Sequence, residues 1–212
     1  MTMFRTMGMG LCALAIAACG GKGGDAAGGG GEGEKAAGPS VADVKAEVEK
    51  AAADVNAKVP EDLKAALTFE AVAGEKDWHV ALQPKGWKSS TIPGLVKPPE
   101  GGPSLGFMTK FSTGSNCDGA CAAKDAAGWK ATADKVEFAQ FASNGEKIAK
   151  DEALPDGRIL VANGDRGRVD IVVARWKDGA ERYFSCRATL EDDAAKAADA
   201  FEAACLAMKP VW

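Results

Sequence analysis

The chain has 212 residues, 46% of them hydrophobic and 26% charged, and a formal net charge of −4. This length suits one globular domain with a buried core. No cluster of five or more basic residues occurs, so the sequence lacks the electrostatic footprint of nucleic-acid-binding proteins, and we expect no nucleic-acid partner. No apolar run reaches the roughly 20 residues that a membrane-spanning helix needs.

The first 18 residues have the pattern of a secretory signal peptide. Arg5 supplies a positive charge, and residues 7–18 are apolar or small without a charge. This run has the length of a signal-peptide apolar core, so it is excluded from fold reasoning. Its removal leaves a net charge of −5, because Arg5 is its only charged residue.

The end of this segment, Ile16-Ala17-Ala18-Cys19, resembles the lipobox of bacterial lipoproteins, although leucine is commoner than isoleucine at its first position. The resemblance implies cleavage before Cys19 and attachment of fatty chains such as palmitate to that cysteine. More than one chain gives stable membrane anchoring. Gly20 follows the cysteine, which in a Gram-negative cell implies export to the outer membrane, on its periplasmic side or surface. The alternative is an ordinary signal peptide cut at the nearby small-residue site.

Residues 19–39 are predicted to form a disordered tether. They are rich in glycine, which buries no apolar area and loses most backbone entropy on ordering. A phosphate-binding loop is the other use of such a run, but the required Gly-Lys-Ser/Thr ending is missing. The sequence thus divides into a signal peptide at 1–18, a lipidated tether at 19–39 and one domain at 40–212.

The domain opens with a predicted helix that ends near Val59, before Pro60. Ser40 and Asp43 have the spacing of a capping box. One stripe of the helix is apolar, and it comprises Val41, Val44, Val48, Ala51 and Val55. We favour a helix packed on its own domain; a self-association seam is the alternative.

A hairpin, a loop, a strand and a helix follow in the prediction. A short helix at 61–67 leads into the hairpin, whose strands at 69–73 and 78–83 flank the turn 74–77. Residues 88–103 are rich in Ser, Gly and Pro and read as a long loop. The next elements are a strand at 105–111 and an Ala-rich helix at 118–135.

The C-terminal part reads as a five-strand antiparallel meander and a closing helix. The candidate strands are 136–142, 146–153, 158–163, 168–176 and 180–190, separated by turn signals such as Asn-Gly and Asp-Gly. The closing helix spans about 192–209, with an apolar stripe of Phe201, Cys205 and Met208. The fold class is therefore α+β, an antiparallel sheet with helices packed against it.

The last hairpin permits a register prediction. If Asp178 and Gly179 form a two-residue loop, Val173 faces Phe184, and Asp170 faces Arg187 as an opposite-charge pair. The shared apolar face then carries Val169, Ile171, Val173, Phe184, Cys186 and Ala188. The other face carries Val172, Trp176 and Tyr183, which form either an exposed aromatic binding patch or a layer covered by the N-terminal helix. We favour the covered layer.

The element order and the turn Pro84-Lys85-Gly86-Trp87 loosely resemble the PsbP/Mog1 type of domain. Members of that group are mostly non-enzymatic accessory proteins. The resemblance therefore implies a binding or assembly role, with another envelope protein as a possible partner.

Four cysteines remain after Cys12 leaves with the signal peptide and Cys19 is lipidated: Cys117, Cys121, Cys186 and Cys205. An even number in an oxidising compartment favours disulfides, with three possible pairings. Cys186 and Cys205 lie on the apolar faces of consecutive elements, so we predict a bond between them. Cys117 and Cys121 would then staple the loop that enters the middle helix.

Metal binding and copper delivery fit the spacing of the cysteines less well than disulfides do. A zinc knuckle needs four closely spaced Cys or His ligands, and we expect no metal. Copper-delivery proteins with a C-x₃-C pair place a histidine downstream of it, whereas the only histidine here, His79, lies upstream.

We identify no G-x-S-x-G nucleophile elbow and no H-E-x-x-H motif. His79, on a predicted strand, is expected to be exposed or structurally hydrogen-bonded, not catalytic. The favoured function is a lipid-anchored envelope protein with a binding or assembly role, no catalysis and no cofactor. The alternative is an envelope enzyme, either a hydrolase or a thiol-redox protein that uses Cys117 and Cys121.

Overall fold

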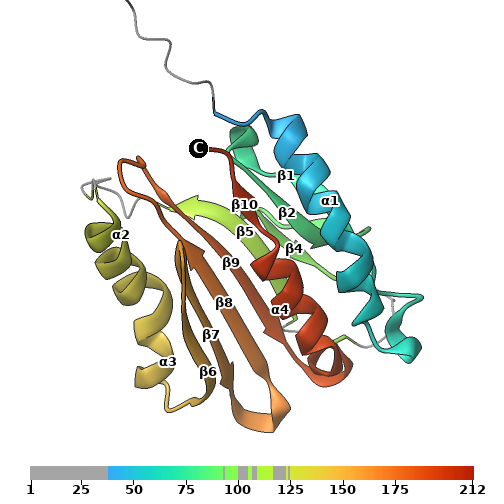
Figure 1. The fold of residues 1–212 in the computed structure, drawn as a ribbon. Helices are drawn as coiled ribbons and strands as arrows, with labels where there is room; N and C mark the ends of the chain where they lie inside the picture. Colours follow the sequence, from blue (N-terminus) through green and yellow to red (C-terminus); the bar gives the residue numbers. More distant parts are fainter. Residues whose placement is uncertain (1–37, 93, 100–104, 107–108, 117–122, 124) are drawn as a thin grey trace, which may run out of the picture. The chain divides into compact units, whose positions relative to one another are not determined.

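The computed structural model describes residues 38–92, 94–99, 105–106, 109–116, 123 and 125–212 (Figure 1). The signal peptide, Cys19, most of the tether, Cys117 and Cys121 lie outside this part, so the predictions made for them remain predictions. The described part is α+β, with antiparallel sheets and helices packed against them, as expected.

The helices are α1 (Val41–Ala57), α2 (Ala126–Ala133), α3 (Ala139–Ser143) and α4 (Ala198–Leu206). The strands are β1 (Phe69–Ala73), β2 (His79–Pro84), β3 (Lys88–Ser89), β4 (Leu95–Lys97), β5 (Lys110–Asn116), β6 (Lys147–Leu154), β7 (Gly157–Asn163), β8 (Val169–Arg175), β9 (Tyr183–Leu190) and β10 (Lys209–Pro210). None of the described helices is long and apolar enough to cross a membrane.

The larger sheet has seven strands in the order β3-β4-β5-β9-β8-β7-β6, and every neighbouring pair is antiparallel. Strands β6 to β9 form a meander, and β5 pairs with β9, the last strand of that meander. The chain therefore crosses one face of the sheet between β5 and β6, and α2 and α3 lie in this crossing. The smaller sheet is β1-β2-β10.

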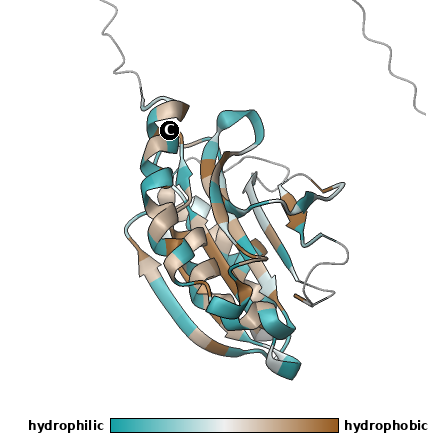
Figure 2. Cartoon of the chain, turned by 90° about the vertical axis from the view of Figure 1, so that its right-hand side faces the viewer, coloured by the Kyte–Doolittle hydropathy of each residue, from teal (hydrophilic) through white to brown (hydrophobic). Residues whose placement is uncertain are grey.

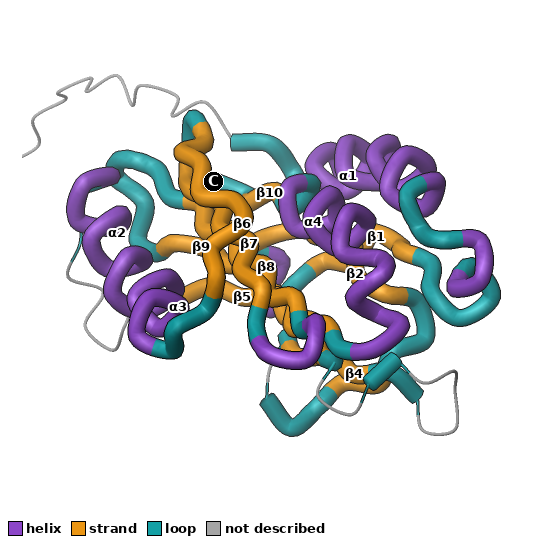
Figure 3. The backbone as a smooth tube through the Cα atoms, turned by 90° about the horizontal axis from the view of Figure 1, so that it is seen from below, coloured by secondary structure: helices purple, strands orange, loops and turns teal. Residues whose placement is uncertain are grey.

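Helices α1 and α4 lie together on one side of the strands, apart from α2 and α3 (Figures 1 and 3). Val44, Val48 and Val55 of α1 are buried against β1, β2 and α4. Hydrophilic and apolar stretches alternate along this helix, as Figure 2 shows. The side chain of Asn56 hydrogen-bonds both the amide and the carbonyl of Phe69, which fixes α1 to β1. These contacts confirm a helix packed on its own domain, because the stripe is not free to form a self-association seam.

A second apolar cluster fills the opposite face of the larger sheet. Val172, Trp176 and Tyr183 are buried there, so they form no exposed patch. The prediction that the N-terminal helix covers them is wrong. They are covered by the segment between β5 and β6 that contains α2 and α3, here called the crossing segment, which contributes Trp129, Ala133, Phe138 and Phe141.

The predicted strand at 136–142 is wrong, because these residues continue the middle helix. After α2 the chain forms a π-helical turn over Asp134–Phe138 and then α3. Trp129, Ala133, Phe138 and Phe141 recur at helical spacing and all face the sheet. The meander accordingly has four strands, and the fifth neighbour is β5.

The predicted register of the last hairpin is wrong by two residues. Val173 faces Cys186 and Ile171 faces Ala188, while Asp170 faces Thr189 instead of Arg187. Only Gly179 of the proposed two-residue loop has positive φ, at 71°, whereas the predicted turn type needs positive φ at both positions. The connection is longer, and the amide of Trp176 instead bonds the carbonyl of Asp156.

Other predicted elements differ in extent or type. The strand expected at 105–111 begins only at Lys110, as β5, and the loop expected at 88–103 contains the short strands β3 and β4. The helix expected from 118 is described from Ala126. The closing helix begins as a 3-10 segment over Asp192–Ala197 before α4, and its stripe of Phe201, Cys205 and Met208 is fully buried.

The predicted Cys186–Cys205 disulfide is confirmed. The two residues are 19 positions apart in sequence, and their Cα atoms are 5.3 Å apart. Both side chains are fully buried. The bond therefore attaches α4 covalently to the centre of the larger sheet.

Candidate binding cleft

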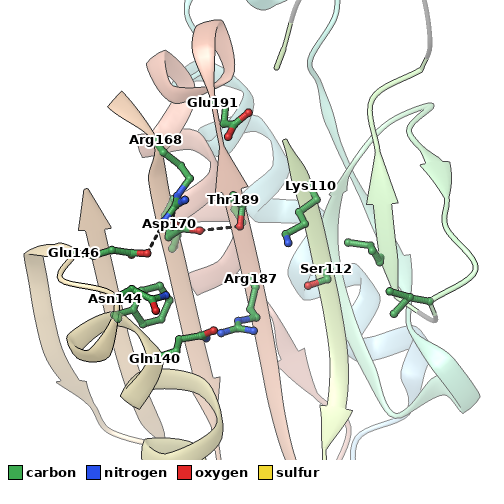
Figure 4. A pocket seen from close by; sticks show the side chains of 15 residues that line it. Lys110, Ser112, Gln140, Asn144, Glu146, Arg168, Asp170, Arg187, Thr189 and Glu191 are labelled. Atoms are coloured by element: carbon green, nitrogen blue, oxygen red, sulfur yellow. Dashed lines mark hydrogen bonds and ion pairs between the residues drawn. The ribbon is translucent and has the colours of Figure 1, made fainter. Parts of the chain in front are cut away.

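A cleft of about 360 Å³ opens on the α2–α3 face of the larger sheet (Figure 4). Its floor is formed by β5, β9 and β8, and one wall is formed by the end of α3 and the residues that follow it. Its polar lining comprises Lys110, Ser112, Gln140, Asn144, Glu146, Arg168, Asp170, Arg187, Thr189 and Glu191. We refer to this site as the cleft.

Strand pairing places the floor residues in two rows. In the first row Lys110 lies opposite Thr189, and Thr189 lies opposite Asp170. In the second row Ser112 lies opposite Arg187. Alternate residues of a strand share a face, so both rows point away from the disulfide side. The crossing segment covers β7 and β8 with apolar groups and leaves these polar rows open.

Arg168 organises the acidic wall of the cleft. Its Nη2 donates to Oε1 of Glu146 at 2.5 Å, and its Nε donates to Oδ2 of Asp170 at 2.7 Å. These partners, Asp170 foremost, raise the pKa of the Arg168 guanidinium. The hydroxyl of Thr189 donates to the other oxygen of Asp170 at 2.7 Å. Both carboxylate oxygens of Asp170 are thus engaged.

Glu146 has one oxygen without a donor. Its side chain is only 5% exposed, and among the described residues no group hydrogen-bonds its Oε2 atom. A buried acceptor left without a donor costs on the order of 1–3 kcal/mol. Glu146, Arg168 and Asn144 also line an adjoining pocket. The ion pair between Glu146 and Arg168 therefore lies between two hollows of the surface.

Glu137 fixes the position of Arg187. The π-helical turn directs this carboxylate inward, where its Oε1 accepts from Asn116 and from Tyr183, both at 3.0 Å. Its Oε2 lies 3.3 Å from Nε of Arg187, whose Nη2 donates to the Glu137 carbonyl at 3.2 Å. A π-helical turn often occurs at functional sites. Here it positions the one arginine of the cleft floor.

Lys110 and Ser112 supply donors that no other described residue engages. Neither side chain has an ion pair or hydrogen bond with another described residue, and both are partly exposed. The apolar part of the cleft is formed by Leu95, Phe141 and Ile92, and Ile92 is 60% exposed. The cleft thus combines free donors, an acidic wall and a small apolar surface.

The two predicted site residues that the structure describes, Cys186 and Cys205, are not part of this cleft. Cys186 lies on the opposite face of the sheet, in the disulfide to Cys205. Cys117 and Cys121 directly follow β5 but lie outside the described residues. Within the described ranges no three His, Cys, Asp or Glu side chains are grouped so that they could hold a metal ion.

The side chain of His79 is buried and has no hydrogen-bond partner among the described residues, so both predicted environments are wrong. Its ring is 1% exposed, packs 5.6 Å from the ring of Phe184 and has no partner for either nitrogen among the described residues. Burial lowers its pKa from 6.5 to about 4, against a smaller opposite effect of Glu75. Phe184 faces the disulfide side, so His79 is remote from the cleft.

The prediction that the sequence has no G-x-S-x-G spacing is wrong. Residues 102–106 read Gly-Pro-Ser-Leu-Gly, the G-x-S-x-G spacing of serine hydrolases. That motif requires a turn from a strand into a helix. Ser104 lies outside the described residues, and the next described element is strand β5. The described residues between Ser104 and β5, namely Leu105, Gly106 and Thr109, are not helical.

The cleft residues themselves had only a weak sequence signal. Asp170 and Arg187 stood out as charges on a polar strand face, but the pair predicted between them does not form. Lys110 and Ser112 alternate along β5, which marks a polar face without indicating a site. Comparison with protein-family models and with curated proteins finds no match for this chain.

Proposed function

We propose that this chain is a lipid-anchored cell-envelope protein whose domain binds a ligand or partner without catalysing a reaction, and that the cleft is its binding site. The observation that carries the binding role is the cleft floor. Lys110, Ser112 and Arg187 present donors on one face of two paired strands, and Lys110 and Ser112 have no partner among the described residues.

The state of the acidic groups supports binding over catalysis. Glu137, Glu146 and Asp170 each form an ion pair with an arginine, so the protein already uses these carboxylates as structural partners. His79 lies on the other side of the sheet, and the described cysteines are joined to each other. The resemblance to the PsbP/Mog1 type points the same way, toward an accessory role.

The envelope address rests on the lipobox-like residues before Cys19. A buried disulfide supports it, because such bonds persist in oxidising compartments and are rare in the cytosol. The proposed anchor is the lipid on Cys19, and the glycine-rich residues after it would give the domain reach from the membrane.

Membrane fractionation tests the anchor. We expect the wild-type chain to sediment with membranes and to carry an acyl mass on Cys19, and Cys19→Ala to lose both. Cys12→Ala is the matched control, because it also removes a cysteine but lies inside the predicted signal peptide. Wild-type protein that keeps residues 1–18 and lacks an acyl group would contradict the proposal.

The binding role is tested by filling the cleft. Ser112→Phe places a bulky ring on the cleft floor without altering a described hydrogen bond. We expect a fragment screen by protein-observed NMR to find ligands whose shifts map to β5 and β9, and Ser112→Phe to abolish these shifts. Hits that bind equally to both proteins, or no hits on this face, would count against the cleft as a binding site.

A further inference from the structure

We infer that the cleft binds a small organic acid, with its carboxylate held by Lys110, Ser112 and Arg187 and with hydroxyl or amino groups facing the acidic wall. This inference rests on the proposed binding role of the cleft and adds the chemical class of its ligand.

The geometry of the floor favours one anionic group. Lys110 lies opposite Thr189 and Ser112 lies opposite Arg187, so Lys110 and Arg187 are diagonal neighbours on β5 and β9. Diagonal neighbours are about 7–8 Å apart at their bases, within reach of long side chains. Figure 4 shows Lys110 and Ser112 on the same side of β5 and Arg187 on the adjacent strand β9. A carboxylate placed between them can accept from all three.

Arg187 is prepared for this contact. Glu137 engages its Nε, and the Glu137 carbonyl accepts from its Nη2. These bonds fix the guanidinium, and its Nη1 has no hydrogen bond or ion pair with a described residue. A fixed donor loses little conformational entropy when it binds, so the Glu137 contacts favour recognition of a planar carboxylate.

The charge balance of the cleft limits the ligand to few negative charges. Arg168 is shared by Glu146 and Asp170, so this group carries one net negative charge. The carboxylate of Glu137 offsets the charge of Arg187. Lys110 forms no ion pair with another described residue, and the carboxylate of Glu191 adds a further negative charge to the lining of the cleft. A single carboxylate matches one such cation, whereas a polyanion would be repelled by the acidic wall.

The acidic wall favours donors on the rest of the ligand. Oε2 of Glu146 has no donor among the described residues, and the side chains of Asn144 and Gln140 line the same region. Hydroxyl or amino groups satisfy acceptors of this kind. The volume of about 360 Å³ lies at the small end of ligand pockets, which suits a hydroxy acid or an amino acid in size.

Three matched probes test the charge requirement. Gluconate carries one carboxylate on a chain of hydroxyls, sorbitol is its uncharged counterpart, and citrate carries three carboxylates. We expect chemical shifts of the cleft residues to titrate with gluconate, with a dissociation constant on the order of 1 mM. Sorbitol and citrate should bind at least about tenfold more weakly.

Two variants locate the carboxylate. Lys110→Gln should weaken gluconate binding at least about tenfold, since it removes a charged hydrogen bond. Lys97→Gln is the matched control, because Lys97 is exposed at the end of β4 and does not line the cleft. Arg187→Lys keeps the charge but loses the planar donor pair, and we expect an intermediate loss.

The possible failures are distinguishable. Gluconate binding that Ser112→Phe abolishes but Lys110→Gln leaves unchanged would overturn the acid inference and retain the cleft as a binding site. Failure of gluconate to bind the wild-type domain, or equal binding of sorbitol, would also overturn the acid inference. The wider proposal would fail separately, through a fragment screen without hits in the cleft or through the Cys19→Ala fractionation.

Discussion

At the scale of single residues, His79 is the least expected group of this domain. It is fully buried on β2, with Phe184 on one side and Gly74 on another. A Cβ atom at Gly74 would lie only 1.9 Å from Cε1 of the imidazole, so the glycine makes room for the ring. With neither nitrogen paired among the described residues, the ring remains neutral, since burial disfavours the charged form.

This environment predicts a pH-dependent stability. The pKa of His79 is about 4 in the folded protein and near 6.5 when unfolded, so the unfolded state takes up the proton first as pH falls. Stability is therefore lost progressively as pH falls from about 6.5 toward 4, by roughly 2 kcal/mol at pH 5. Urea unfolding of the wild-type domain at pH 7 and at pH 5 measures this loss.

His79→Phe provides the comparison, because it keeps an aromatic ring but cannot take up a proton. We expect its free energy of unfolding to fall by roughly 2 kcal/mol less between pH 7 and pH 5 than that of the wild type. At pH 7 it should be close to the wild type, since no described hydrogen bond is lost. An identical loss in both proteins would show that carboxylates, and not His79, govern the acid sensitivity.

At the scale of elements, α1 illustrates a local signal that succeeds. The hydroxyl of Ser40 accepts from the amide of Asp43 at 3.2 Å, and the Asp43 carboxylate accepts from the Ser40 amide at 3.3 Å. Both halves of the capping box are therefore present. All partners lie within four consecutive residues, so the sequence alone was sufficient to predict it.

The cap makes a measurable contribution to stability. We expect Ser40→Ala to lower the free energy of unfolding by about 1 kcal/mol, because the first turn of α1 loses an acceptor. Ser40→Gly should cost only a few tenths of a kcal/mol, since glycine suits the N-cap position. Thermal unfolding of the three proteins gives the order, and equal stability of the alanine and glycine variants would contradict it.

The π-helical turn and the last hairpin show where local signals fail. Residues 136–142 have apolar positions compatible with both a strand and a helix, and burial against the sheet decides for the helix. In the hairpin, the alternation of apolar and polar residues shows which side chains share a face, but the pattern looks the same after a shift of two residues. It therefore excludes a slip of one residue and not the observed slip of two, which moves Arg187 from Asp170 to the Glu137 contact.

At the scale of the whole molecule, the cleft depends on pairings between distant parts of the chain. Strand β5 pairs with β9 although β6, β7 and β8 lie between them in sequence. Lys110 and Arg187 become neighbours only through that pairing, and Glu137 reaches Arg187 only through the crossing segment. The fold class and the disulfide followed from local patterns and adjacent elements, whereas the site required a topology that no local pattern encodes.

The disulfide contributes to the stability of the whole domain. Replacing Cys186 and Cys205 together by alanine removes a closure over 19 residues, and we expect a loss of about 3 kcal/mol. Guanidinium unfolding measures the loss, and the wild type with reductant should approach the double variant. If reductant leaves the free energy of unfolding of the wild type unchanged, the bond has no structural role.

Strand β6 closes one edge of the larger sheet, and its sequence restricts how copies of the protein can meet. It carries Lys147, Lys150, Asp151 and Glu152 along its length, and its pairing with β7 shifts between Ile148 and Lys150. Charges and such a bulge discourage a foreign strand from extending a sheet. Molecules held on a membrane by the proposed lipid anchor would collide often, and the charges and bulge of β6 favour their remaining separate instead of polymerising through their strands.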